Sequence, residues 1–161
     1  MPEFKKVLQS SMKVRFHDCD PFNHLNNSRY IDYIIAARGD QLQENYGFDI
    51  YTMARQQGIG WVTAQTEISY LSPATLMEEV IIETQLLTYG ARSLLFEARM
   101  WNDSKTELKA VLWGKLVHFN LRTQKSQQHS DELMNFFSEV VNPLPEEMNF
   151  ESRVKFLKQN V

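Results

Sequence analysis

Cysteine is almost absent from this sequence, and glycine is sparse. Cys19 is the single cysteine among 161 residues, which excludes an intramolecular disulfide and a metal site built from several cysteines. The six glycines are scattered, which excludes the clustered glycine loops that bind phosphates or dinucleotides. These absences predict a reduced, cytoplasmic protein.

Two further features are missing, namely an excess of positive charge and a long apolar run. Lys and Arg number 17 against 20 Asp and Glu, whereas a nucleic-acid-binding protein usually carries a basic excess. No apolar run approaches the ~20 residues of a membrane span, and residues 1–11 lack the apolar core of a signal peptide. We therefore expect a soluble chain of one domain that binds no nucleic acid and spans no membrane.

The sequence does contain one long helical pattern and several long strand patterns. Apolar residues alternate with polar ones over residues 12–17, which predicts within residues 8–20 a strand that leads into a loop. Apolar residues recur at helical spacing over residues 27–46, which predicts the longest helix, and a short helix near 51–57 follows. Turn residues then separate predicted strands at residues 61–71, 78–88, 92–101 and 107–121.

The order of these elements predicts an α+β fold in which the long helix lies on one face of an antiparallel sheet. Gly39 within the helix predicts either a break or bend, or a close approach to a sheet or a partner. Gly47 can end this helix. Ser130 is placed to cap a short helix over residues 130–140, and residues 146–161 predict a last helix or a partly disordered tail.

The loop between the first strand and the long helix concentrates polar side chains that can do chemistry. A helix start presents unpaired backbone N–H groups, which can stabilise the negative charge that develops on a carbonyl oxygen. A nearby aspartate can attack the carbonyl carbon or activate a water molecule. This combination suits acyl transfer without serine or metal. The side chains concerned are Asp18, Asp20, Asn23, His24, Asn26 and Asn27.

Other interpretations of the same residues remain open at this point. Asp18 and Asp20 are also suited to solvation or capping of the loop, and His24 to hydrogen bonding within it. The spacing of the His, Cys and Asp residues at 17–24 matches no metal-ligand pattern. Cys19 as a nucleophile requires a paired histidine, and Glu67 is the other acid to consider.

The run RFHDCDPFNHLNNSRY at residues 15–30 resembles the start of the hotdog-fold acyl-CoA thioesterases of the 4-hydroxybenzoyl-CoA thioesterase-like family. These proteins have a strand that ends in an aspartate, a loop of the form D-x-x-x-H-x-N-N-x-x-Y, and then a central helix. The matching residues are Asp20, His24, Asn26, Asn27 and Tyr30.

The resemblance implies a hotdog fold, in which a curved antiparallel sheet of about five or six strands wraps a long central helix. It implies one domain over residues 1–161, with a helical extension at about 130–161. It further implies hydrolysis of acyl-CoA thioesters without cofactor or metal, in a homodimer or homotetramer whose sites lie between subunits. Asp20 is then catalytic, as nucleophile or general base, and His24, Asn27 and Tyr30 bind substrate.

Two departures from related motifs narrow this expectation. Phe22 stands where similar acyl-carrier-protein thioesterases have asparagine, which favours a mechanism centred on Asp20. Asn23 stands where many relatives have glycine, and asparagine tolerates the left-handed backbone conformation. A carrier-protein thioesterase and a non-catalytic acyl-CoA-binding dimer remain alternatives. Glu44 lies too near the helix end for the glutamate of other hotdog enzymes.

Two sets of residues are expected to contact the substrate. Apolar residues of the helix and the sheet would line the acyl pocket, and basic residues would contact the CoA phosphates. The candidates for the pocket are Ile31, Ile34 and Trp61, and those for the phosphates are Arg92, Lys115 and Arg122.

Overall fold

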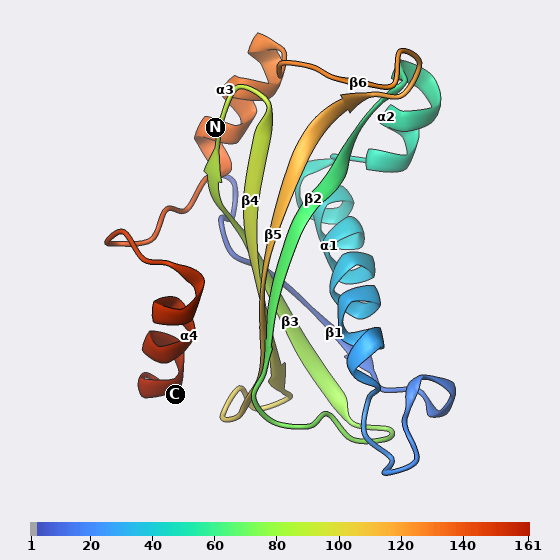
Figure 1. Cartoon of the computed structure of the whole chain (residues 1–161), viewed down its shortest axis with the longest axis vertical. Helices are drawn as coiled ribbons and strands as arrows, with labels where there is room; N and C mark the ends of the chain where they lie inside the picture. The colour runs from blue at the N-terminus through green and yellow to red at the C-terminus, as the bar shows by residue number, and fades with distance from the viewer. Residues whose placement is uncertain (1–2) are drawn as a thin grey trace.

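A computed structural model describes residues 3–161 and contains the elements that the sequence predicts (Figure 1). The strands are β1 Leu8–Lys13, β2 Ile59–Tyr70, β3 Glu79–Tyr89, β4 Ser93–Asn102, β5 Leu108–Asn120 and β6 Lys125–Ser126. The helices are α1 Tyr30–Tyr46, α2 Ile50–Gln57, α3 Asp131–Val140 and α4 Phe150–Gln159, with short 3-10 turns at Phe16–Asp18 and Asn27–Arg29. None of the helices in the described residues has the length and apolar character needed to span a membrane.

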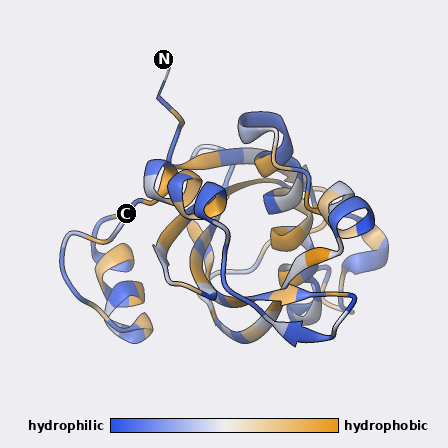
Figure 2. Ribbon diagram, turned by 90° about the horizontal axis from the view of Figure 1, so that it is seen from above, coloured by the Kyte–Doolittle hydropathy of each residue, from blue (hydrophilic) through white to orange (hydrophobic). Residues whose placement is uncertain are grey.

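The sheet is antiparallel and curls around α1. Its strand order is β1-β3-β4-β5-β2, and the short β6 pairs with β5. The register shifts between Thr63 and Gln65 in β2 and between Leu86 and Thr88 in β3. Such bulges bend a strand and increase its twist. Seen from above, the bent sheet curves around the helix (Figure 2), as the predicted fold class requires.

The main core lies between α1 and the concave face of the sheet. Ile34 and Ala37 of α1 are buried against this face, where Ile82, Ala98 and Leu112 come from three adjacent strands. The helix runs without a break through Gly39 and ends at Gly47, whose φ is 64°. The break considered for Gly39 is therefore wrong. The close contact there is with Tyr51 of α2, rather than with the sheet.

The last helix covers the opposite, convex face of the sheet (Figure 1). Arg153 of α4 donates to both carboxylate oxygens of the fully buried Glu97, from Nε at 2.8 Å and from Nη2 at 3.0 Å. Val154 packs on Val111 beside this ion pair. Because both faces of β5 are covered, apolar residues occupy both sides of that strand.

Two buried histidines connect α3 to the sheet. His118 of β5 and His129, next to the Ser130 cap of α3, lie with ring centres 4.9 Å apart. The Nδ1 atom of each ring lies within 3.0 Å of a carbonyl oxygen, of Gly60 for His118 and Gly90 for His129. The indole of Trp61 donates to Nε2 of His129 at 3.0 Å. This arrangement accommodates neutral imidazoles, and burial lowers the pKa of both histidines.

We expect the protein to lose stability as the pH falls below about 6.5, the ordinary pKa of histidine. In that range the unfolded chain binds protons that the folded chain does not, so the free energy of unfolding decreases. Urea denaturation across this pH range measures the slope of the free energy of unfolding against pH. The double variant His118→Gln/His129→Gln should flatten it, whereas a change at the exposed His17 should not. An unchanged slope in the double variant would contradict the prediction.

Candidate active site

The carboxylate of Asp20 is held by backbone amides on one side only. Its Oδ1 accepts hydrogen bonds from the N–H of Phe22 at 2.8 Å and from that of His24 at 3.1 Å. Its Oδ2 accepts none from residues 3–161. The side chain is partly buried. One oxygen therefore fixes the orientation of the group, and the other is available to a substrate or a water molecule.

The loop around Asp20 is tied to the segment that precedes β3. The N–H of Leu25 donates to the carbonyl of Ala74 at 2.7 Å, and that of Leu76 donates to the carbonyl of Asn23 at 2.9 Å. The φ of Asn23 is 61°, in the left-handed region that the sequence analysis expects this residue to tolerate. These bonds give the loop one defined conformation, and His24 lies within it, partly buried.

The start of α1 is preceded by one 3-10 turn, so the regular helix begins three residues later than the pattern from residue 27 predicts. Asn26 caps this turn by accepting from the N–H of Ser28 at 3.0 Å. The carbonyl of Asn27 accepts from the hydroxyl of Tyr70 at 2.9 Å. The N–H of Asn27 donates to no acceptor in the described chain. A free backbone donor therefore lies at the helix start, seven residues after Asp20.

Tyr30 lies in the core and supports the start of α1. Its side chain is 2% exposed, and its hydroxyl accepts from the N–H of Ala74 at 3.1 Å. Its ring packs edge-on against Tyr70, and burial raises its pKa. Tyr30 thus connects α1 to the segment that also holds the Asp20 loop. Its predicted role in substrate binding stays a prediction.

Asp18 and Cys19 have surroundings different from those of Asp20. The hydroxyl of Tyr33 donates to Oδ2 of Asp18 at 2.6 Å, and the guanidinium of Arg29 lies 3.8 Å from Oδ1. Asp18 therefore ties the loop to α1. Burial and the two neighbouring aspartates raise the pKa of Cys19, which disfavours a reactive thiolate. Within residues 3–161, no three His, Cys, Asp or Glu side chains gather to hold a metal ion.

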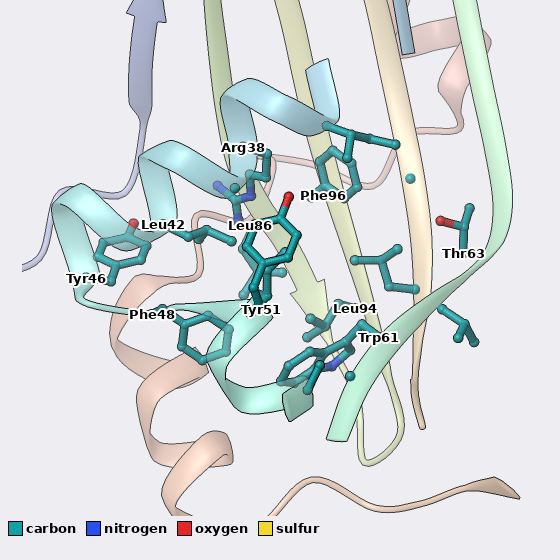
Figure 3. A pocket seen from close by; sticks show the side chains of 18 of the residues that line it. Arg38, Leu42, Tyr46, Phe48, Tyr51, Trp61, Thr63, Leu86, Leu94 and Phe96 are labelled. Carbon is teal, nitrogen blue, oxygen red and sulfur yellow. The ribbon is translucent and has the colours of Figure 1, made fainter. Parts of the chain in front are cut away.

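A mostly apolar cavity of about 390 Å³ runs along α1, between that helix and the sheet (Figure 3). Ile31 and Trp61 line it, as predicted, whereas Ile34 lies in the closed core and does not. Phe136 and Phe137 of α3 form part of its wall, although residues 130–161 are predicted from the sequence only to extend the domain. The apolar spacing of Leu133, Phe137 and Val140 is the signal that α3 packs here.

The cavity and the Asp20 loop are adjacent but separate in one chain. The cavity begins near Ile31, one helical turn beyond Asn27, and Asp20 is not part of its wall. Arg92 follows the end of β3 and Arg122 the end of β5, whereas the Asp20 loop is bonded to the segment before β3, at the opposite end of the sheet. These two arginines therefore do not gather with Asp20 in the same chain.

A long helix enclosed by a curled antiparallel sheet defines the hotdog fold, which confirms the predicted architecture. The chain is 27% identical over 134 residues to the long-chain acyl-CoA thioesterase FadM of Escherichia coli, covering 83% of this chain and 99% of that protein. It is 24% identical over 101 residues to the acyl-CoA thioesterase YbgC of Haemophilus influenzae, covering 63% and 74%.

A solved structure and a family model agree with these relatives. The crystal structure of YbaW, a probable thioesterase from Escherichia coli, superposes with a TM-score of 0.71 at 26% identity, covering 84% of this chain and 99% of that one. The model of the thioesterase-like superfamily matches residues 14–149. The chain belongs to this superfamily, and the resemblance seen in its sequence is confirmed.

The left-handed conformation of Asn23 leads to a test of the loop. We expect Asn23→Gly to leave stability nearly unchanged, because glycine adopts this conformation freely. Asn23→Val should lower the free energy of unfolding by about 1–2 kcal/mol, because a branched side chain clashes with the backbone there. Chemical denaturation of both variants measures the difference. Equal stability of the valine and glycine variants would show that the loop has another conformation.

Proposed function

We propose that this protein hydrolyses acyl-CoA thioesters to a free acid and CoA, with Asp20 as the catalytic carboxylate. The observation that carries the proposal is that one carboxylate oxygen of Asp20 is free, in the loop that leads to the unpaired N–H of Asn27 at the start of α1. The neighbouring apolar cavity suits an acyl chain. Membership of the thioesterase-like superfamily and the names of the relatives support the same reaction.

Asp20 has two routes to the products. As a general base, its Oδ2 takes a proton from water while the water oxygen attacks the thioester carbonyl. The N–H of Asn27 then stabilises the negative oxygen, the C–S bond breaks, and the CoA sulfur receives the proton. As a nucleophile, Oδ2 attacks the carbonyl itself, CoA leaves, and water hydrolyses the acyl–aspartyl anhydride. His24 lies within the same loop, and we retain it and Tyr30 as substrate-binding residues.

The proposal includes a homodimer or homotetramer whose active sites lie between copies of the chain. Strand β2 is an edge of the sheet, and residues 62–67 along it are exposed, which leaves a strand edge open to pairing. Phe16 and Phe22 flank Asp20 and are each 77% exposed, as expected for a surface that packs against a partner. We also retain a cytoplasmic location and one domain over residues 1–161.

The central test is Asp20→Asn, assayed on a panel of short, medium, long and aromatic acyl-CoAs. The amide oxygen can still accept the two backbone N–H groups, so we expect a folded protein. Its kcat/KM should fall at least ~100-fold, because a positioned acid–base group contributes this much or more.

Asp18→Asn is the matched control, because it keeps an acceptor for Tyr33 and has no role in the proposed chemistry. Equal activity of Asp20→Asn and the parent chain would refute the assignment. Tight binding of acyl-CoA without hydrolysis would favour a non-catalytic acyl-CoA-binding dimer. Activity only on acyl-carrier-protein substrates would favour a carrier-protein thioesterase.

Light scattering at micromolar concentration tests the oligomer, and we expect a mass of two or four chains. Gln65→Glu adds a carboxylate near Glu67 on the exposed stretch of β2, so like charges from two copies would meet across a dimer axis. We expect this variant to dissociate more readily than Gln128→Glu, which places the same charge at an exposed site outside β2. A monomeric parent chain would contradict the shared site.

A further inference from the structure

Arg38 is a charged residue in the wall of a mostly apolar cavity (Figure 3). Two other arginines with little side-chain exposure have carboxylate partners, since Arg99 lies 2.9 Å and Arg153 2.8 Å from Glu97. Among residues 3–161, no carboxylate lies within 4.0 Å of Arg38. A cation in apolar surroundings without a counter-charge costs folding free energy, so its presence calls for a functional reason.

The contacts of Arg38 orient its guanidinium without neutralising it. Its Nη1 donates to Oγ1 of Thr84 at 2.8 Å, and the hydroxyl of Thr84 in turn donates to Oε1 of Gln41 at 2.6 Å. The group also lies 5.8 Å from the ring centre of Phe96. That ring lies across Gly114, where a Cβ would come within 2.3 Å of it. Glycine at this position therefore allows Phe96 to support the arginine.

The remaining donors of Arg38 border the cavity. Its Nε and Nη2 donate to no acceptor in the described part of the chain. Every fully buried side-chain nitrogen or oxygen of these residues has a partner, so the free donors are accessible. Burial lowers the pKa of Arg38 to about 10, and the group stays charged at neutral pH.

Tyr51 adds a second polar group at the same level of the cavity. Its hydroxyl lies 3.7 Å from the position of a Cβ at Gly39, the residue after Arg38. Tyr51 of α2 lines the same cavity as Arg38 of α1 (Figure 3), and because this tyrosine is 60% exposed it lies on the open side of the cavity. Its hydroxyl makes no hydrogen bond with residues 3–161. By contrast, the hydroxyl of Tyr46 donates to the carbonyl of Lys5.

We propose that Arg38 and Tyr51 bind a carboxylate at the far end of the acyl group, so that the preferred substrates are acyl-CoAs with an ω-carboxyl group. A planar guanidinium with two free donors matches a carboxylate in geometry and charge. Arg38 lies eight residues beyond Tyr30, about 12 Å along the helix axis. An acyl chain of medium length spans this distance between the helix start and Arg38. The inference rests on the proposed thioesterase function.

The test compares dodecanedioyl-CoA with lauroyl-CoA, which has the same chain length and no ω-carboxylate. We expect the parent chain to favour the dicarboxylic substrate. Arg38→Met, which keeps much of the volume, should lower kcat/KM for dodecanedioyl-CoA about 10- to 100-fold, the value of hydrogen bonds to a charged group. Its kcat/KM for lauroyl-CoA should stay the same or rise. Arg38→Lys should retain part of the preference, because it keeps the charge and loses the planar fork.

Arg55→Met, at an exposed position of α2, is the matched control and should keep the parent preference. The proposal is wrong if the parent chain has no preference for the dicarboxylic substrate, or if Arg38→Met lowers both activities equally. Dissociation of the oligomer by Arg38→Met would instead assign the arginine a structural role, and would also overturn the proposal.

A binding measurement separates this inference from the proposed function. In the Asp20→Asn background, calorimetry compares dodecanedioyl-CoA with lauroyl-CoA. We expect tighter binding of the dicarboxylic thioester, and loss of that difference when Arg38→Met is added. This result would support the carboxylate site even if no thioester were hydrolysed. Active hydrolysis of lauroyl-CoA by the parent chain with equal binding of the two thioesters would leave the thioesterase function intact and overturn the carboxylate site.

Discussion

The burial of α1 within the curl of the antiparallel sheet is the constraint on which the rest of the molecule depends. Apolar side chains of the helix need an apolar surface, and bulges in β2 and β3 bend the sheet enough to provide one on three strands at once. The same arrangement fixes where the helix begins. It therefore fixes the position of its unpaired N–H groups relative to the loop that carries Asp20.

The polar groups of functional interest lie at two points along this buried helix. At its start, loop hydrogen bonds hold Asp20, and the N–H of Asn27 is unpaired. Farther along, Arg38 faces the cavity and is oriented by Thr84 and Phe96. One helix thus sets the distance between a reacting end and a far end of an acyl group, since a helix rises about 1.5 Å per residue.

Much of the fold could be predicted because local patterns and packing agree. The strand patterns at residues 61–71 and 107–121 became β2 and β5, and Ser130 caps α3 as expected. The helix start was placed three residues early, because a 3-10 turn has nearly the same local pattern as the first helical turn. Ile34 was assigned to the pocket because periodicity identifies a buried face, and does not separate a packed core from a cavity wall.

The sequence by itself determined the class of fold, the loop with Asp20 and the left-handed turn at Asn23, because these depend on residues close together in the chain. The tertiary structure alone decided which oxygen of Asp20 is free, that Asp18 is tied to Tyr33, and that α3 closes the cavity. It also decided that Arg38 has no carboxylate partner, because its neighbours Thr84 and Phe96 come from strands more than forty residues away. Contacts between distant segments arise only when the sheet closes around the helix, so the local sequence pattern does not predict them.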